Sequence, residues 1–273
     1  VLLTGEQQGY YSAYHGDLYE LARTIERGQL YEGQEFSLTG KPRGKPASRV
    51  PRHRLIYALQ NHDQVGNRAQ GERLHALCRP EQFAAASLLL LALPSTPLLF
   101  MGQEWAASTP FLYFTNHAGK LGRSVSAGRR AEFRGNASFA AQADIPDPQA
   151  LDTYERSKLD WRELTQRDHA RMRALYRRAL HLRRTDPVLS DPNAQLRVGV
   201  LGPVLWLTRS STAGERLVLF NPGGAVIMPE VVGFAPKATR LLESNGRVHT
   251  ARGVFGLPAW CTAIFDVNRS FKP

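Results

Sequence analysis

Two short, wholly apolar runs separated by a helix-like segment stand out in the first half of the chain. Residues 55–59 (LIYAL) and residues 97–101 (PLLFM) each end abruptly in polar residues. Between them, Pro80 suits the first turn of a helix that we expect to reach about Leu93. Strands that are apolar at every position are typical of parallel sheets buried on both faces. The order strand, helix, strand therefore predicts a βαβ unit.

Two further segments have the pattern of helices. Residues 17–28 have a plausible N-cap in Asp17 and a stop in Gly28. Residues 166–185 predict a long helix that ends before Pro187. By contrast, residues 33–52 are rich in Gly, Pro and Arg and predict a long loop. Residues 106–160 are expected to be mostly irregular.

The period of apolar residues changes to two from about Gln195 onward, which is typical of strands with one buried face. Turn residues separate the runs, which are residues 196–201, 204–208, 217–220, 240–242 and 261–265. The pattern predicts an antiparallel β-module. We place the domain boundary near Pro187, which gives one domain of residues 1–186 and a second of residues 187–273.

The composition excludes several classes of protein. Hydrophobic residues make up 42% and charged residues 22%, as in ordinary globular domains. The longest apolar run is far shorter than a membrane span and we find no signal peptide, so we expect a cytoplasmic protein without a membrane partner. Cys78 and Cys261 favour two reduced thiols over one disulfide. No Cys/His cluster has zinc spacing, and we expect no metal and no cofactor.

The formal net charge of +11 raises the question of a nucleic-acid partner. Many arginines fall in the predicted helix 166–185, where the apolar positions repeat at intervals of three and four and mark one buried face. The arginines lie mostly off that face. We therefore favour a solvated basic face over a nucleic-acid surface, and expect no nucleic-acid partner.

Polar residues with chemical potential follow both apolar runs. Asn61, His62 and Asp63 come after the first, and Gln103, Glu104 and Trp105 come after the second. Functional groups of parallel α/β folds sit at the C-terminal ends of strands. Either cluster alone could equally well cap a loop or helix, but their occurrence after both strands favours a shared site.

The same residues suit a carbohydrate ligand. Carboxylates and imidazole can bond sugar hydroxyls. Aromatic rings can stack on the apolar faces of pyranoses, and four follow closely: Trp105, Phe111, Tyr113 and Phe114. Aromatic clusters are more often core than ligand platform, so this evidence is weak on its own.

The string LQNHDQVGNR at residues 59–68 is similar to the fourth signature region of the α-amylase superfamily, glycoside hydrolase family 13. Residues 71–74 (GERL), 96–117 and 155–161 (ERSKLDW) most resemble its malto-oligosyltrehalose trehalohydrolase subgroup. The resemblance covers nearly the whole chain and is weakest over the β-module. It implies the last part, about two strands, of a (β/α)8 TIM barrel followed by a small antiparallel β-sandwich. It also implies hydrolysis of the α-1,4 bond next to the terminal trehalose of maltooligosyl-trehalose.

The resemblance assigns roles residue by residue. Asp63 matches the third catalytic carboxylate, which grips ring hydroxyls and stabilises the oxocarbenium-like transition state. The residues that it implies for substrate binding are His62, Asn61, Gln64, Asn67, Arg68, Glu104, Trp105, Phe111 and Phe114. Gln103 and Asn116 stand where relatives are expected to carry acidic residues, and their effect on turnover stays open.

Two further carboxylates are needed, because glycoside hydrolysis uses a pair that flanks the bond. The resemblance places the nucleophilic Asp and the acid Glu on the fourth and fifth barrel strands, upstream of the residues present here. No Arg-x-Asp pattern occurs before Leu55. We therefore expect the chain to be inactive alone, and to be stable only with a missing N-terminal part or by leaning on its β-module. In particular, we expect the apolar faces of residues 83–101 to lose most of their partners.

Three other interpretations stay open. The chain could be a non-catalytic glucan-binding remnant, which glucan binding without hydrolysis would support. It could come from another amylase-type enzyme such as a glucan branching enzyme, although the string after Asp63 fits that less well. A basic nucleic-acid binder is the third.

Overall fold

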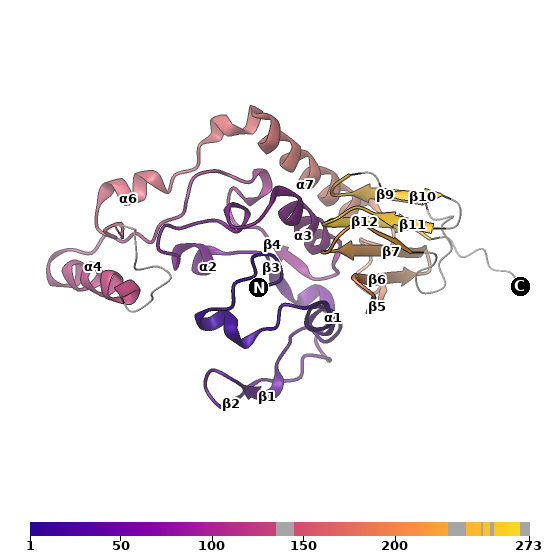
Figure 1. Cartoon of the computed structure of the whole chain (residues 1–273), viewed down its shortest axis with the longest axis horizontal. Coiled ribbons are helices and arrows are strands. Elements are labelled where there is room, and N and C mark those ends of the chain that lie inside the picture. Colours follow the sequence, from indigo (N-terminus) through magenta and orange to yellow (C-terminus); the bar gives the residue numbers. More distant parts are fainter. Residues whose placement is uncertain (135–144, 229–238, 247, 252–253, 268–273) are drawn as a thin grey trace, which may run out of the picture. The chain divides into compact units, whose positions relative to one another are not determined.

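The computed structural model describes residues 1–134, 145–228, 239–246, 248–251 and 254–267. The chain forms two compact units, each assembled from segments that are distant in the sequence. The first unit comprises Val1–Tyr57, Cys78–Pro97 and Ala174–Pro273, and the second comprises Ala58–Leu77 and Leu98–Arg173. Figure 1 labels the helices and strands of both units.

The first unit opens with η1 (Gly9–Ala13), α1 (Leu18–Arg27) and η2 (Arg52–Arg54). The predicted ends of α1 are confirmed. The Asp17 side chain accepts from the backbone N of Glu20 at 2.8 Å, and Gly28 ends the helix in a left-handed conformation with φ 97°. That conformation is open to glycine because it lacks a Cβ atom.

A hairpin replaces part of the loop that was expected at residues 33–52. Strands β1 (Glu32–Phe36) and β2 (Lys41–Gly44) pair antiparallel. Phe36 is buried, and the Arg43 guanidinium lies over its ring, 4.1 Å from the centroid. Such a cation–π contact stabilises two strands whose residues have poor strand propensity. The loop prediction is wrong here because tertiary contacts outweigh propensity.

The predicted strand–helix–strand order is found as β3 (Ile56–Ala58), α3 (Pro80–Ala92) and β4 (Thr96–Leu98). The strands β3 and β4 are hydrogen-bonded neighbours in a two-stranded sheet. Both are shorter than the apolar runs that predict them. Ile56 is 66% exposed and Leu98 is 39% exposed, so the expectation of strands buried on both faces is wrong for this chain.

Helix α3 is buried on every side. Every residue from 83 to 93 is buried. Thr262 on β12 donates from Oγ1 to the carbonyl of Ala85 at 2.7 Å, and the Tyr176 hydroxyl donates to Ser87 Oγ at 2.9 Å. The expectation that this apolar segment loses most of its partners is therefore wrong for the helix. The β-module and the helix that carries Tyr176 cover it instead.

The β-module contains two antiparallel sheets, as the period of two predicts. The larger has the order β5 (Gln195–Leu201), β6 (Val204–Ser211), β7 (Gly214–Asn221), β12 (Cys261–Asp266) and β9 (Thr239–Glu243). The smaller has the order β10 (His249–Ala251), β11 (Val254–Leu257) and β8 (Val226–Met228). The smaller sheet was not predicted, because its strands are too short to show a period.

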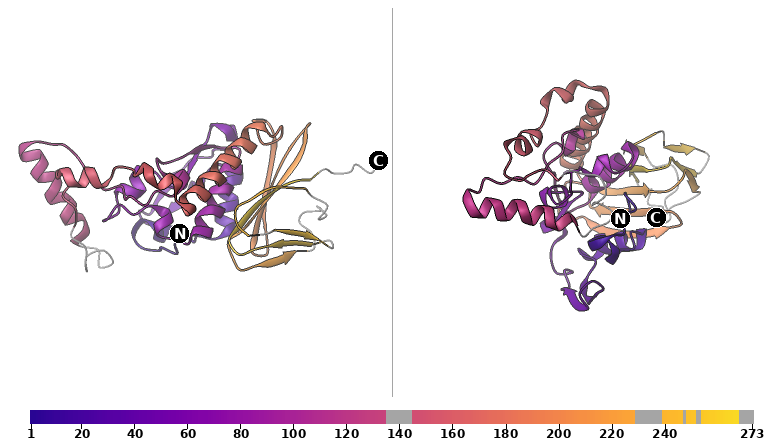
Figure 2. Two further views of the ribbon diagram at one scale, coloured as in Figure 1. Left: turned by 90° about the horizontal axis from the view of Figure 1, so that it is seen from above. Right: turned by 60° about the vertical axis from the view of Figure 1, so that its left-hand side comes forward.

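The two sheets enclose a common hydrophobic core, and the two layers of strands can be followed in Figure 2. Cys261, Ala263 and Phe265 of β12 point into this core. Alternation along a strand turns Thr262 and Ile264 to the opposite face, where α3 packs against β12. The larger sheet is therefore covered on both faces, by the smaller sheet and by α3.

The second unit holds the polar segments that follow β3 and β4. It comprises α2 (His62–Gly66), η3 (Leu74–Ala76), η4 (Gln103–Trp105), α4 (Gly119–Arg134), α6 (Leu151–Arg156), η5 (Trp161–Thr165) and the start of α7 (Arg167–Thr185). Helix α7 confirms the predicted long helix. Within residues 106–160, expected to be mostly irregular, the structure has the two helices α4 and α6.

The sequence hides α4 because its buried stripe is not apolar. The inner positions are Gly122, Ser126, Arg129 and Phe133, spaced by four, three and four residues. This is the spacing of one helix face, but three of the four residues are not hydrophobic. A search for apolar periodicity therefore passes over it.

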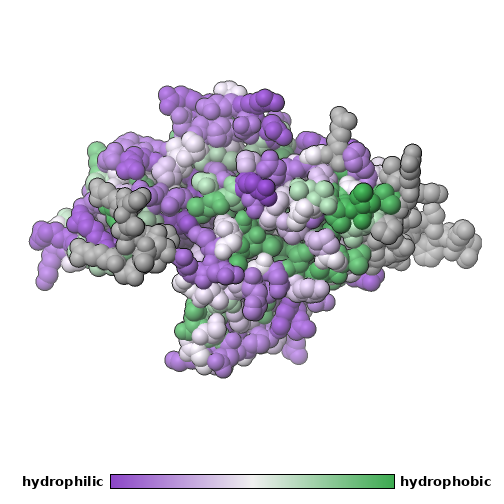
Figure 3. Space-filling view, viewed as in Figure 1, coloured by the Kyte–Doolittle hydropathy of each residue, from purple (hydrophilic) through white to green (hydrophobic). Residues whose placement is uncertain are grey.

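The last features of the fold are its surface and its two cysteines. Apolar residues reach the surface on the face shown in Figure 3, and exposed apolar side chains of the second unit include Met101, Leu121 and Leu151. Among the described residues, no helix has the length and apolar character needed to cross a membrane. Cys78 and Cys261 are not joined in a disulfide, and burial raises the pKa of the Cys78 thiol to about 11.

Candidate functional site

The polar turn after β3 is the start of a short helix. Asn61 is the N-cap of α2, and its side-chain oxygen accepts from the backbone N of Asp63 at 2.8 Å and of Gln64 at 3.3 Å. In return, Gln64 Oε1 accepts from the Asn61 backbone N at 2.8 Å. This capping box satisfies backbone donors that the first turn of a helix leaves free. The Asn61 and Gln64 side chains thus orient the turn.

His62 and Asp63 are the outward-facing pair of this turn. His62 Nε2 lies 3.3 Å from Asp63 Oδ1, and the two side chains are 72% and 68% exposed. A pair this exposed contributes little to stability. Its oxygens and ring nitrogens stay open to a ligand, and both groups can hydrogen-bond hydroxyls. The turn therefore displays two polar groups that the fold itself does not need.

A buried arginine from α4 fixes the far end of this turn. Arg129 Nη2 donates to the carbonyls of Gly66 at 2.7 Å and Arg68 at 2.9 Å. Its guanidinium also lies over the Tyr113 ring, 5.1 Å from the centroid. Arg129 is absent from the predicted site residues. No apolar periodicity points to it, because three of the four buried residues of α4 are not hydrophobic.

The remaining residues of the turn lie beside these anchors. Asn67 is exposed, and its backbone N donates to the Asp63 carbonyl at 3.1 Å. Arg68 Nε lies 3.7 Å from Glu72 Oε2. The structure thus brings Asn61, His62 and Asp63 together with the other predicted residues of this segment.

A chain of aromatic rings packs beside α2. Phe111 meets Phe100 and Phe114 edge to face, with centroids 5.1 Å and 5.7 Å apart. The Phe111 backbone N donates to the Gly71 carbonyl at 2.9 Å. At Gly71, φ is +61° and an added Cβ would lie 2.5 Å from the Phe111 backbone, so only glycine allows this approach. Phe111 and Phe114 are half-buried, so part of each ring is accessible.

Trp105 lies in a different environment from the one predicted. It is 2% exposed, and its Nε1 donates to the buried Glu163 carboxylate at 3.3 Å. Its ring centroid lies 5.0 Å from that of Trp161. A ring covered in this way cannot stack on a sugar. Trp105 therefore fixes the loop that carries Glu104, which is half-buried.

Polar side chains with buried donors hold the same loop. Arg73, 1% exposed, donates from Nε to the Thr109 carbonyl at 2.6 Å and from Nη1 to the Met101 carbonyl at 2.7 Å. His75 Nε2 lies 2.9 Å from the Ala107 carbonyl, and burial lowers the His75 pKa to about 4. The imidazole is thus neutral near pH 7. These three contacts to backbone carbonyls hold the loop in place.

The exposed groups of this segment are of the kinds that hydrogen-bond hydroxyls. They are a carboxylate and an imidazole on the turn, with partly accessible aromatic edges beside it. Among the described residues, no group of three or more His, Cys, Asp or Glu could hold a metal ion.

Relatives of known identity match the chain. It is 50% identical over 255 residues to the malto-oligosyltrehalose trehalohydrolase of Deinococcus radiodurans, covering 90% of this chain and 42% of that protein. It is 42% identical over 222 residues to the protein of the same name from Brevibacterium helvolum, covering 80% of this chain and 37% of that protein. The chain thus spans less than half the length of these relatives. No protein-family model matches it.

Solved structures give a consistent picture. A Salmonella typhimurium protein provisionally identified as an alpha amylase superposes with a TM-score of 0.82 at 32% identity, covering 97% of this chain and 44% of that one. A trehalulose synthase superposes with a TM-score of 0.51 at 18% identity over 78% of this chain and 43% of that one, a likeness of fold alone.

Proposed function

Since this chain belongs to the malto-oligosyltrehalose trehalohydrolase family of α-amylase-type proteins, we propose that it forms part of a glycosidase that releases trehalose. The reaction is hydrolysis of the α-1,4-glucosidic bond next to the terminal trehalose of maltooligosyl-trehalose. The observation that carries this proposal is the exposed His62–Asp63 pair, displayed by a capped turn within a segment similar to a superfamily signature.

In this proposal Asp63 is the transition-state stabiliser. Its carboxylate grips ring hydroxyls of the glucose at the cleavage point, and negative charge beside the ring favours the oxocarbenium-like transition state. His62 binds hydroxyls in the same subsite, and Asn67 and Arg68 shape its wall. Asn61 and Gln64 act mainly by orienting the turn, because their side chains are engaged in the capping box.

The aromatic residues border the groove in this proposal. Phe111 and Phe114 offer ring edges to the glucan. Glu104 bonds hydroxyls from a loop that Trp105 and Arg73 hold in place. Trp105 thus contributes by positioning, since its buried ring is not free to stack.

We further propose that β3 and β4 are two of the eight strands of a (β/α)8 barrel in residues 1–186, followed by a β-sandwich in residues 187–273. The exposed Ile56 and Leu98 side chains support this, since the remaining barrel strands would cover them. The rest of the barrel, and the bond-breaking Asp and Glu, would come from further parts of the same enzyme. Cys78 and Cys261 of this chain are not joined in a disulfide, which suits a cytoplasmic location.

A chimera tests this function. Residues 1–273 replace the matching part of the Deinococcus radiodurans relative, which is 50% identical over 255 residues. We expect the chimera to release trehalose from maltooligosyl-trehalose at a rate within about tenfold of that relative. A tenfold loss of rate corresponds to about 1.4 kcal/mol of transition-state stabilisation, and a site with equivalent residues should lose less than that. A folded chimera that binds maltooligosyl-trehalose but releases no trehalose would favour the glucan-binding remnant. Transfer of glucan branches without trehalose release would favour a branching enzyme.

A further inference from the structure

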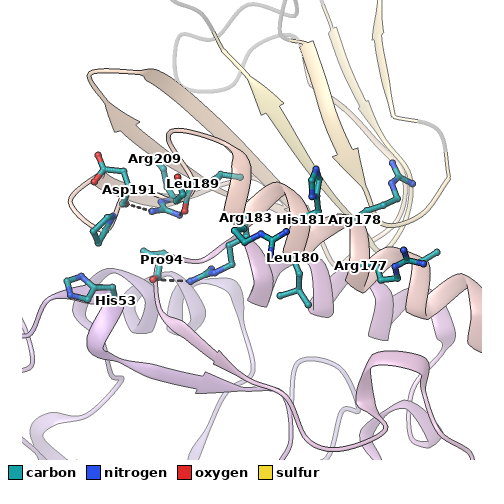
Figure 4. A pocket seen from close by; sticks show the side chains of 14 residues that line it. His53, Pro94, Arg177, Arg178, Leu180, His181, Arg183, Leu189, Asp191 and Arg209 are labelled. Atoms are coloured by element: carbon teal, nitrogen blue, oxygen red, sulfur yellow. Dashed lines mark hydrogen bonds between the residues drawn. The ribbon is translucent and has the colours of Figure 1, made fainter. Parts of the chain in front are cut away.

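A groove lined by arginines lies within the first unit, apart from the residues assigned above. Its volume is about 1040 Å³. It is lined by His53, Pro94, residues of α7, the segment that follows α7, and Arg209 of β6. Figure 4 shows Arg177, Arg178 and Arg183 on the helix, and Arg209 across from them. We propose that this groove binds a small phosphorylated anion with two or more phosphoryl groups.

The lining is strongly unbalanced in charge. It contains five guanidinium groups, from Arg177, Arg178, Arg183, Arg184 and Arg209, against the single carboxylate of Asp191. Among the described residues, none of these arginines forms a salt bridge within 4.0 Å. Guanidinium stays charged at all ordinary pH values. The groove therefore carries uncompensated positive charge.

Two of the guanidinium groups are held in place by neutral partners. Arg183 donates to the carbonyls of Leu91 at 3.0 Å and Ser95 at 2.7 Å. Arg209, 1% exposed, donates to the carbonyls of Leu189 at 2.7 Å and Asp191 at 2.8 Å. Carbonyl oxygens fix the position of a guanidinium without cancelling its charge.

The two charges also destabilise each other. Burial lowers the Arg209 pKa to about 10, and the nearby Arg183 cation contributes to the shift. The Nε of Arg209 is buried and has no acceptor among the described residues. An anion in the groove would relieve this repulsion, because opposite charge beside a buried cation favours its charged form.

The sequence does not offer the usual partners for these arginines. Residues 169–185 contain six arginines and no Asp or Glu, so the exposed face of α7 has no carboxylate at the i+4 positions that pair charges on helices. Arg183 and Arg184 lie in the last turn, where cations suit the helix dipole. That explanation does not extend to Arg177 and Arg178, which lie more than one turn earlier.

The arrangement favours phosphate over other ligands. Guanidinium binds phosphate in a bidentate manner, and the exposed Arg177, Arg178 and Arg184 have donors to spare. From Arg177 to Arg184 the helix rises by seven steps of 1.5 Å, or about 10 Å, which is wider than one phosphate. A neutral glucan would gain nothing from such charge. A small molecule with several phosphoryl groups fits both the spread and the volume.

The test uses the 273-residue chain and sodium tripolyphosphate in isothermal titration calorimetry. We expect saturable binding at one site. The double variant Arg178→Gln/Arg184→Gln should weaken it by about 10- to 100-fold, because it removes two of the three exposed guanidinium groups that can donate charge-assisted hydrogen bonds to a phosphate. The matched control Arg167→Gln/Arg171→Gln removes the same charge from exposed positions of α7 outside the groove. It should change the affinity by less than about threefold.

Several outcomes would overturn the proposal. These are no saturable binding of tripolyphosphate, equal weakening by both double variants, or equally tight binding of citrate. Single-stranded DNA that binds and is not displaced by tripolyphosphate would replace it with a nucleic-acid surface. The variant Arg178→Lys/Arg184→Lys keeps the positive charge and controls for loss of binding through misfolding. It should bind tripolyphosphate more tightly than the Gln double variant does. Binding no tighter than that of the Gln double variant counts against the proposal. The proposal is independent of the hydrolase function.

Discussion

A chimera that carries Asp63→Asn is expected to release trehalose roughly 100- to 1000-fold more slowly than the same chimera with Asp63 intact. The substitution keeps the shape of the side chain and removes its negative charge. It leaves the capping box intact, because Asp63 takes part in that box only through its backbone N. The loss should fall mainly on kcat, since the charge acts on a positive charge that develops in the transition state.

The control for this variant is Asp152→Asn in the same chimera. Asp152 lies on α6, its side chain is 75% exposed, and its only described ion pair is a weak contact of 3.6 Å with Arg156. Initial rates of trehalose release from both variants give the comparison. If Asp63→Asn and Asp152→Asn retain the same activity, Asp63 has no role in the reaction.

The second large effect is expected at Asp186, the residue just before the β-module. We expect Asp186→Ala to lower the free energy of unfolding by about 3–5 kcal/mol. Asp186 Oδ2 accepts from Arg216 Nε at 2.8 Å, and both side chains are less than one-tenth exposed. Asp186 Oδ1 also accepts from the backbone N of Val188 and Leu189, each at 2.9 Å. Its removal leaves a buried guanidinium with one remaining carboxylate, that of Asp266.

Urea denaturation followed by circular dichroism measures this loss. Asp186→Asn can keep the acceptor for the two backbone N–H groups, so it should cost less than the alanine variant. The matched surface substitution Asp152→Ala should cost less than about 1 kcal/mol, because exposed pairs contribute little. Equal costs at positions 152 and 186 would show that the buried pair does not support the fold.

The sequence predicted the elements that carry a clear period. The long α7, the ends of α1 and the strands of the larger sheet all lie where the pattern places them. Helix α3 was found from Pro80 and its length, although its apolar residues have no preferred face. That lack of a face is what burial on every side requires.

Prediction from the sequence failed where the place of a residue in the fold, and not its type, decides whether it is buried. Ile56 and Leu98 are as apolar as core residues, but both stay exposed on the two-stranded β3–β4 sheet. Conversely, Arg129 and Arg73 are buried because backbone carbonyls meet their donors. No pattern of hydrophobic residues in the sequence predicts such contacts.

The candidate site shows the same division. The segment of residues 61–68 could be identified from the sequence, and its capping box explains why Asn61 and Gln64 occur together. The aromatic residues could not be sorted into platform and core from the sequence. The structure separates the buried Trp105, whose Nε1 donates to the buried Glu163 carboxylate, from the half-buried Phe111 and Phe114.

We propose above all that residues 61–68 form a glucan-binding wall that holds one of the three carboxylates of the reaction. The most direct measurement is calorimetric titration of the 273-residue chain with maltooligosyl-trehalose, with free trehalose assayed in the same samples. We predict binding without trehalose release, and at least about tenfold weaker binding for the double variant His62→Ala/Asp63→Asn, since two hydrogen-bonding groups are lost. Trehalose release by the chain alone, or binding that the double variant leaves unchanged, would contradict the claim.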